Sequence, residues 1–264
     1  MDFNLLSYSQ PDAVRGYAEA SKLSKCEAYL FEKYINRTDA ILDVGVGGGR
    51  TSEFIAGKAG TYVGLDYSPA MVEACRQRYP KLNFVCGDAT RLDLFPDETF
   101  DVAVFSLNGI DSLPTDGQRA RCFREASRVL RKGGRFIFSS HNAASVGFVA
   151  KISETWYRMR LREELFPEVR KMGLATVLLR ILRSFRISST IWFRRLFVGR
   201  MHHGTGYVYD RSHGGLILFV STPECIRQEA QAAGFQVIEI VNANHPFDPP
   251  SFVTQWYYYV LRKV

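Results

Sequence analysis

The residues best suited to chemistry form a glycine-rich run directly after a short apolar stretch. Residues 43–49 read Asp-Val-Gly-Val-Gly-Gly-Gly, and the apolar residues 40–42 precede them. Glycine allows positive φ and close approach of the backbone to a ligand, and a helix that begins after such a turn presents free N–H groups. Asp66 ends the next apolar run, where a carboxylate suits the two hydroxyls of a ribose. The pattern predicts a nucleotide-binding turn.

The glycine spacing distinguishes two classes of nucleotide-binding enzyme. The Gly-x-Gly-x-x-Gly fingerprint of dinucleotide dehydrogenases requires glycine at position 50, where this chain has Arg50. The Asp-x-Gly-x-Gly-x-Gly pattern resembles instead the first motif of class I S-adenosylmethionine-dependent methyltransferases. Further segments resemble the later motifs of that family in the same order: Asp66-Tyr67, Gly87-Asp88-Ala89, Phe105-Ser106-Leu107-Asn108, and the helix-turn-strand over residues 125–135.

The resemblance covers residues 40–140 and is strongest to small-molecule and quinone-type methyltransferases. It implies S-adenosylmethionine as the cofactor, with Asp88 near the adenine amino group and Asn108 near the amino group of the methionine portion. Tyr17, in a helix that covers this pocket in the family, is expected to touch the carboxylate end or simply to pack there, and Arg15 is a further candidate. The cofactor-binding residues expected in this way are Tyr17, Asp43, Gly45, Gly47, Gly49, Asp66, Tyr67, Met71, Asp88, Ala89, Ser106, Leu107 and Asn108.

A general base is the second chemical requirement, where the methyl acceptor must lose a proton. The sulfonium already activates the methyl group, so the transfer is one in-line displacement that needs alignment and exclusion of water. His141 is the base candidate because it follows the fifth strand at the carboxyl edge of the sheet, where ligands bind. A helix cap or a surface histidine is the alternative interpretation.

A second group of histidines and tyrosines lies further along the chain. His202, His203 and Tyr207 are candidate acceptor-facing residues of a lid, with Tyr209 and His213 nearby and glycines on both sides. No carboxylate or cysteine joins the histidines at a ligand-like spacing, so no metal site is expected. A solvated loop is the alternative.

The elements that must position these residues follow an alternating pattern. Strands are predicted at residues 40–44, 61–65, 82–86, 102–106, 135–140, 235–241 and 255–261. Helices are predicted at residues 11–20, 25–34, 51–56, 68–78, 118–130 and from 221 to 233. The predicted fold is α/β, a seven-stranded doubly wound, Rossmann-like sheet that is mostly parallel with an antiparallel last strand.

A helical insertion interrupts the alternation. Residues 1–142 and 216–264 are expected to form the core with its N-terminal helices, and residues 143–215 a mostly helical, basic and aromatic insertion that covers the acceptor site. Residues 145–215 hold 13 Lys and Arg against 5 Asp and Glu, whereas the remainder of the chain is close to neutral.

One part of the insertion has a cationic amphipathic pattern. Apolar residues recur at helical spacing over 174–186 beside three arginines, and residues 191–197 mix arginine with aromatic groups. Packing on the domain explains this pattern; the alternative is peripheral contact with a membrane or a lipid-like acceptor through residues 174–200.

Composition sets the remaining limits. The chain has 264 residues, of which 46% are hydrophobic and 23% charged, as in an ordinary globular protein. No secretory signal and no transmembrane segment are expected, because the first residues lack a basic segment followed by an apolar one and no apolar run is long enough to span a membrane. Its five cysteines are dispersed, which favours buried free thiols and a cytoplasmic location. The alternative of a location peripheral to a membrane depends on residues 174–200.

The expected function is methyl transfer to a small, largely hydrophobic acceptor, such as a quinone, secondary metabolite or lipid-like molecule. One alternative is RNA methylation through the basic insertion, since the isoelectric point is near 9.2. DNA is not expected as a partner, because the Asn/Asp-Pro-Pro-Tyr/Phe motif is absent at strand four. A non-methylating enzyme of the same fold, such as an aminopropyltransferase, would offer acidic groups there, and Asp111 is one. Monomer and homodimer both stay open.

Overall fold

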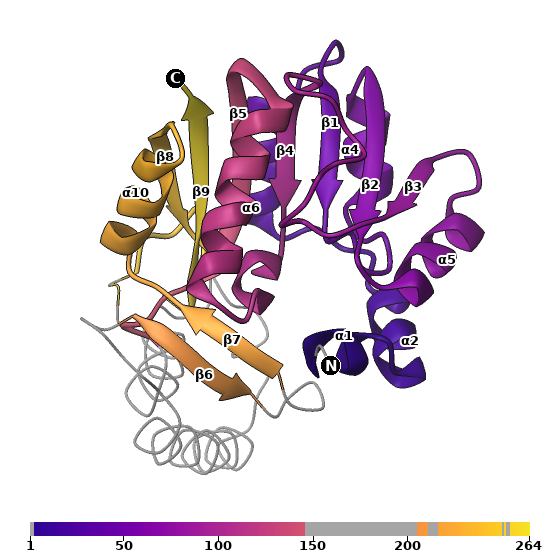
Figure 1. Cartoon of the computed structure of the whole chain (residues 1–264), viewed down its shortest axis with the longest axis horizontal. Coiled ribbons are helices and arrows are strands. Elements are labelled where there is room, and N and C mark those ends of the chain that lie inside the picture. Colours follow the sequence, from indigo (N-terminus) through magenta and orange to yellow (C-terminus); the bar gives the residue numbers. More distant parts are fainter. Residues whose placement is uncertain (1–2, 146–204, 211–215, 250, 252–253) are drawn as a thin grey trace.

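The computed structural model describes residues 3–145, 205–210, 216–249, 251 and 254–264 and contains a central seven-stranded sheet (Figure 1). Its strands run in the order β3-β2-β1-β4-β5-β9-β8. They are β1 (Ala40–Val44), β2 (Thr61–Asp66), β3 (Asn83–Cys86), β4 (Phe100–Phe105), β5 (Leu130–His141), β8 (Phe235–Asn242) and β9 (Trp256–Lys263). Neighbouring strands from β3 to β5 are parallel, and β9 pairs antiparallel with both β5 and β8. The predicted fold class is confirmed.

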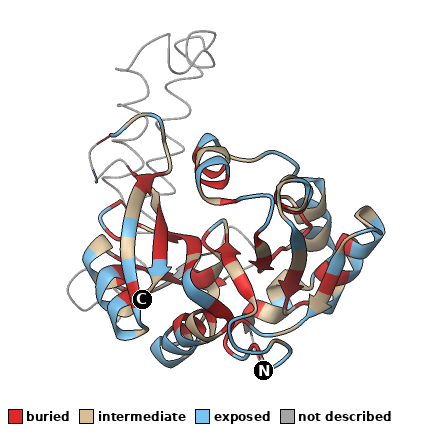
Figure 2. Cartoon of the chain, turned by 90° about the horizontal axis from the view of Figure 1, so that it is seen from above, coloured by how far each residue is buried: buried red, intermediate tan, exposed pale blue. Residues whose placement is uncertain are grey.

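Helices cover both faces of this sheet, and Figure 2 shows buried residues along the strands with exposed residues on the outer faces of the helices. Leu42 packs in a cluster with Phe123 of α6 (Asp116–Val129) and Ile226 of α10 (Pro223–Ala232). Its neighbour Ile41 packs on the opposite face with Leu30 of α3 (Lys25–Tyr34), beside α4 (Ser52–Lys58). Ile41 and Leu42 are both fully buried, although they face opposite sides of the sheet. This explains why the strand reads as a continuous apolar run rather than an alternating one.

The carboxyl ends of the parallel strands meet at one edge, and three further elements lie beside that edge (Figure 1). They are α1 (Phe3–Tyr8), α2 (Pro11–Glu19) and a ribbon of β6 (Gly206–Asp210) paired antiparallel with β7 (Leu216–Val220). Asn4 joins α1 to β7 and to the segment after β4, because its side-chain amide donates to the carbonyls of Ser112 and Ile217 and accepts the N–H of Ile217.

The ribbon includes residues of the segment expected to be mostly helical, most of which lies outside the described residues. Residues 206–210 form a strand, because the alternating aromatic and β-branched residues favour a pleated backbone and the apolar run of β7 supplies a partner. The chain leaves the core after β5 and returns at the same place: Asn142 bridges Ser221, and Ala143 donates its N–H to the Ser221 carbonyl.

All five cysteines are described, and none forms a disulfide. Cys26, Cys75 and Cys122 are buried as expected. Cys86 is exposed, so the prediction that every thiol is buried is wrong: Cys86 is the last residue of the edge strand β3, where no further strand covers it. Within the described residues, every helix is too short or too polar to cross a lipid bilayer.

Candidate functional site

The glycine turn leads from β1 to α4 and requires its glycines for two different reasons. Gly45, Gly47 and Gly49 all have positive φ, at 63°, 52° and 80°, a backbone conformation that side chains with a Cβ rarely adopt. Gly48 has ordinary φ, but a Cβ there would lie 2.4 Å from the backbone of Tyr17 and Ala18. The turn is therefore shaped to receive the end of α2 on one side.

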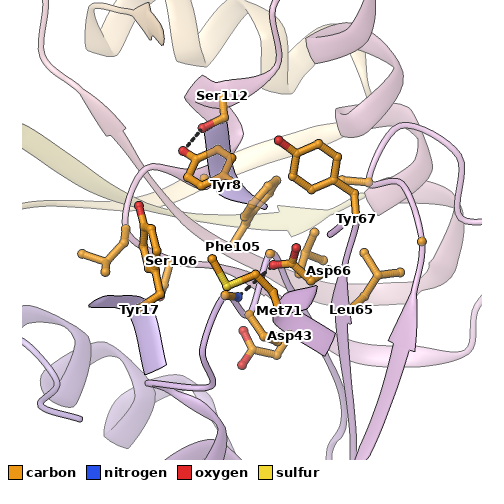
Figure 3. Close-up of a pocket in the computed structure, with 18 of the residues that line it drawn as sticks. Tyr8, Tyr17, Asp43, Leu65, Asp66, Tyr67, Met71, Phe105, Ser106 and Ser112 are labelled. Carbon is orange, nitrogen blue, oxygen red and sulfur yellow. Dashed lines mark hydrogen bonds between the residues drawn. The ribbon is translucent and has the colours of Figure 1, made fainter. Parts of the chain in front are cut away.

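Asp66 binds this turn from the end of β2. Its Oδ2 accepts the N–H of Gly47 at 2.8 Å (Figure 3). Its Oδ1 accepts the N–H of Ser68 at 2.9 Å. Burial raises the pKa of the carboxyl, and the two backbone N–H groups act in the opposite direction by stabilising its charged form. The carboxylate lines a pocket at the carboxyl edge of the sheet.

Asp43 lies next to the turn and fixes its position through hydrogen bonds. Its Oδ2 accepts the hydroxyls of Thr51 at 2.8 Å and Tyr62 at 3.0 Å. Burial raises the pKa of Asp43 to about 6, although both hydroxyls favour the carboxylate. Asp43 therefore fixes β1, β2 and the start of α4 relative to one another, and it also borders the pocket.

The pocket collects most of the residues predicted from the motifs. Figure 3 shows Tyr17, Asp43, Asp66, Tyr67, Met71 and Ser106 around it. Gly45, Gly47, Asp88, Ala89 and Leu107 complete the predicted residues that line it. Met71 comes from α5 (Pro69–Arg78), and Asp88 follows β3.

Two predicted cofactor residues, Gly49 and Asn108, do not line the pocket, and neither does Arg15. Gly49 instead packs behind the turn, where a Cβ would lie 2.9 Å from the ring of Tyr79. Asn108 is buried, donates its N–H to the Ser139 hydroxyl at 2.7 Å and places its amide nitrogen 3.3 Å from Nε2 of His141. Their roles as cofactor contacts stay predictions.

The segment after β4 has an unusual backbone. Leu107 and Asn108 both have positive φ, at 49° and 58°, and lead into the short 3-10 helix η1 (Gly109–Ser112). Non-glycine residues in this region cost free energy and occur where the surrounding structure requires them. The bend exposes Leu107 to the pocket and directs Asn108 towards β5.

His141, the predicted base, ends β5 one strand away from this bend. Its Nδ1 lies 2.8 Å from Oδ2 of Asp111, which also accepts the His141 N–H at 2.7 Å. Asp111 is fully buried and paired with the guanidinium of Arg119. This pairing leaves Asp111 unable to serve as an acidic group for a polyamine, the feature on which the aminopropyltransferase alternative depended.

Several pocket residues were not predicted from the sequence as contacts. Tyr8 of α1 lines the pocket and shares a hydrogen bond with the Ser112 hydroxyl at 2.8 Å (Figure 3). Phe105 lines it too and lies under Gly45, where a Cβ would meet its ring at 2.4 Å. Arg50, used above only to exclude dehydrogenases, makes two hydrogen bonds to Glu27 and thereby anchors α3 to the glycine turn.

Most of the candidate lid residues lie outside the part of the chain that the structure describes. His202, His203 and His213 lie outside the described residues, as do residues 174–200. Tyr207, in β6, donates its hydroxyl to Asp116 at 2.9 Å and packs against Phe219. It does not line the pocket in the described part of the chain. No group of three or more potential metal ligands occurs among the described residues.

The residues present fit an adenosine-containing ligand with a polar, charged tail. A buried carboxylate faces the pocket at the end of β2, the glycine turn presents backbone beside it, and tyrosines from α1 and α2 cover the opening. This arrangement occurs at the edge where nucleotides bind in open α/β sheets.

Comparison with known proteins gives the same assignment. Residues 42–138 match the family model described as a methyltransferase domain. The chain is 32% identical to a demethylmenaquinone methyltransferase of Tropheryma whipplei over 137 residues, 51% of this chain and 52% of that one. It is 28% identical to a malonyl-[acyl-carrier protein] O-methyltransferase of Marinomonas over 212 residues, 73% of this chain and 74% of that one.

The fold comparison extends over nearly the whole chain. An S-adenosylmethionine-dependent methyltransferase structure from Clostridium acetobutylicum superimposes with a TM-score of 0.59 at 12% identity, covering 99% of this chain and 97% of that one. In sequence, the chain spans about half the length of most of the curated relatives it matches. The predicted cofactor, S-adenosylmethionine, is confirmed at the level of the family. Residues 42–138 therefore form a methyltransferase domain, as the resemblance to class I, S-adenosylmethionine-dependent methyltransferases predicted.

Proposed function

We propose that this protein transfers the methyl group of S-adenosylmethionine to a small, largely hydrophobic acceptor. The observation that carries the proposal is the single pocket in which Asp66, the glycine turn and Asp88 converge with an aromatic cover from α1 and α2. S-adenosylmethionine supplies a methyl group already activated by the sulfonium. The protein's part is to bind, align and exclude water.

Each group of lining residues has a separate part in this proposal. Asp66 accepts the ribose hydroxyls while it keeps its bond to Gly47. Asp88 and Ala89 lie at the end of β3, on the adenine side, and Met71 and Tyr67 offer apolar surface there. Tyr8 and Tyr17 approach from the N-terminal helices and exclude water from the opposite side.

The apolar acceptor is supported by two observations. Beside the residues assigned to the adenine, the pocket wall contains Tyr8, Tyr17 and Phe105, which offer hydrophobic contact. The relatives named above include a methyltransferase of demethylmenaquinone. We further propose that residues 143–215 form a lid over the acceptor, because the chain leaves and re-enters the core beside His141, at the carboxyl edge of the sheet.

A substrate screen tests the acceptor class. Purified protein and tritiated S-adenosylmethionine are incubated with apolar cell extracts that have been fractionated by polarity. A separate incubation contains total RNA in place of the extracts. The proposal expects label in an apolar small molecule. If RNA is labelled instead, and the amount of label falls steeply as the salt concentration rises, the acceptor is RNA rather than an apolar small molecule. The assignment as a methyltransferase would stand.

A further inference from the structure

We infer that Asp111 and His141 form a base dyad and that the methyl acceptor is a hydroxyl group whose proton His141 takes. The inference rests on the proposed function and names its acceptor chemistry. Asp111 is the positioning residue, and His141 is the residue that meets the acceptor.

The contacts of Asp111 determine which nitrogen of His141 carries a proton. Oδ2 of Asp111 accepts both the backbone N–H and the Nδ1–H of His141, at 2.7 and 2.8 Å. A carboxylate has only acceptors, so Nδ1 must be the protonated nitrogen of a neutral ring. Nε2 is then left with its lone pair, which is the state a general base requires.

The carboxylate itself is held in place by buried partners. Arg119 Nη1 donates to Oδ1 of Asp111 at 3.1 Å, and the Ser140 hydroxyl donates to the same oxygen at 2.7 Å. The side chains of Asp111 and Arg119 are both completely buried. Arg119 is therefore the counter-ion that lets Asp111 stay ionised away from water.

The same arginine holds a second carboxylate. Arg119 also pairs with Glu229 of α10 through two hydrogen bonds of 2.9 and 3.0 Å. Two carboxylates and one guanidinium leave a net charge of minus one when the imidazole is neutral, and zero once it is protonated. An imidazolium that forms during the transfer is thus stabilised by the adjacent carboxylate.

Nε2 lies next to the pocket, with Asn108 between the imidazole and the lining residues. It is 3.3 Å from the amide nitrogen of Asn108, and the residues on either side of Asn108, Leu107 and Gly109, both line the pocket. The side chain of His141 is 28% exposed, in contrast to that of Asp111. The protonated nitrogen thus faces Asp111, and Nε2 faces the Asn108 amide, whose place the acceptor hydroxyl takes when it binds.

The acceptor class follows from what such a base is needed for. Among oxygen and nitrogen acceptors, a carboxylate is already ionised and a neutral amine attacks through its own lone pair, so neither needs a base before transfer. A hydroxyl must lose its proton. The O–CH₃ bond forms as the S–CH₃ bond breaks, the electron pair of the broken bond remains on sulfur, and the hydroxyl proton passes to Nε2 of His141.

Nuclear magnetic resonance of the full-length protein, labelled with ¹⁵N at histidine, tests the dyad without any acceptor. His141→Gln identifies the resonances of His141, and His245→Gln, which removes a histidine stacked on Tyr29, is the matched control. At pH 8 the expected state is the neutral Nδ1–H form of His141. Asp111→Asn is expected to shift it towards the Nε2–H form, because an amide can donate to Nδ1. A neutral Nε2–H form in the unmodified protein would overturn the inference even if Asp111→Asn does not fold.

A pair of phenols tests the acceptor chemistry with 4-methoxyphenol and the more acidic 4-nitrophenol as probes. His141→Gln should slow methylation of 4-methoxyphenol by about 10²–10⁴-fold and that of 4-nitrophenol, largely ionised at pH 8, far less. Equal losses for both probes would show a structural role and overturn the inference. S-adenosylmethionine binding is measured by calorimetry on the same samples. If the unmodified protein does not bind S-adenosylmethionine, the proposed function is contradicted. If it binds normally but His141→Gln slows methylation of both phenols equally, only the dyad is contradicted.

Discussion

At the scale of single residues, Asp66 connects the glycine turn to the ligand. It accepts the Gly47 N–H and lines the pocket, so its removal loosens the turn and deletes a charged acceptor for ribose hydroxyls. Hydrogen bonds to charged groups contribute about 1.5–3 kcal/mol, so Asp66→Ala should weaken S-adenosylmethionine binding about ten- to a hundredfold. Calorimetric titration measures the change. Asp93→Ala, at an exposed surface pair, is the control, and equal affinity in both variants would remove Asp66 from the site.

Asp43 gives a pH-dependent prediction of stability. Burial raises its pKa from 3.8 to about 6, so between these pH values the folded protein holds a proton that the unfolded chain has released. The contribution of this group to the free energy of unfolding therefore falls as the pH rises from 4 to 6 and stays low above it. Asparagine cannot ionise and can still accept both hydroxyl hydrogen bonds. Asp43→Asn should thus be more stable than the unmodified protein by about 2–3 kcal/mol at pH 8, with a smaller gain at pH 4.5.

Urea unfolding at the two pH values measures this difference. A gain of the same size at pH 4.5 and pH 8 would show that ionisation of Asp43 is not its source.

The sequence identified the pocket residues that belong to ordered motifs, and it missed those that reach the pocket from elsewhere. Asp66, Asp88 and the glycine turn follow predicted strands, so the topology of a parallel sheet brings them to one edge. Tyr8 lies about a hundred positions before its hydrogen-bond partner Ser112. The Asp111–His141 contact depends on β4 and β5 being neighbours and on the bend at Asn108. Nothing local in the sequence encodes either contact.

At the scale of elements, the packing of α2 on the glycine turn is the most specific contact of the site. A Cβ on Gly48 would collide with the backbone of Tyr17 and Ala18, which cannot move aside as a side chain can. Gly48→Ala should displace the end of α2 and lower S-adenosylmethionine affinity about tenfold or more, a loss of roughly 1.4 kcal/mol or greater. The far-ultraviolet circular dichroism should stay unchanged.

Gly16→Ala provides the matched control on the same helix. No atom lies within 4 Å of a Cβ at Gly16, and alanine in a helix is favoured over glycine by about 0.5–1 kcal/mol. Cofactor affinity should be retained in this variant. Similar losses in both variants would mean that α2 does not close the pocket through Gly48.

The core strands were predicted to within a few residues at their ends, whereas the ribbon was not predicted. Strands such as β1 are buried on both faces and read as apolar runs bounded by turn residues. Residues 206–210 instead lie among glycines and histidines, and their strand depends on pairing with β7. The helix α1 has only six residues, too few for a helical period to be recognised.

At the scale of the whole molecule, Arg119 joins four elements in one buried cluster. It lies in α6, donates to Asp111 and Ile110 of η1 and to Glu229 of α10, and its guanidinium stacks on Phe219 of β7 at 4.1 Å. Arg119→Ala would leave Asp111 buried without its cation, which should lower the free energy of unfolding by about 3–5 kcal/mol.

Arg227→Ala removes an exposed helical ion pair and should change stability by less than about 1 kcal/mol. Thermal and urea unfolding of the two variants provide the comparison. A small effect of Arg119→Ala would mean that the cluster does not hold these elements together.

The central claim is that the pocket binds S-adenosylmethionine, and isothermal titration of the pure full-length protein with S-adenosylmethionine tests it most directly. The account predicts one site per chain with a dissociation constant on the order of 1–100 μM, within the usual range for enzyme ligands. It also predicts that Asp66→Ala and Gly48→Ala weaken binding while Gly16→Ala does not. No heat of binding from a correctly folded protein, or binding that none of these substitutions changes, would contradict the claim.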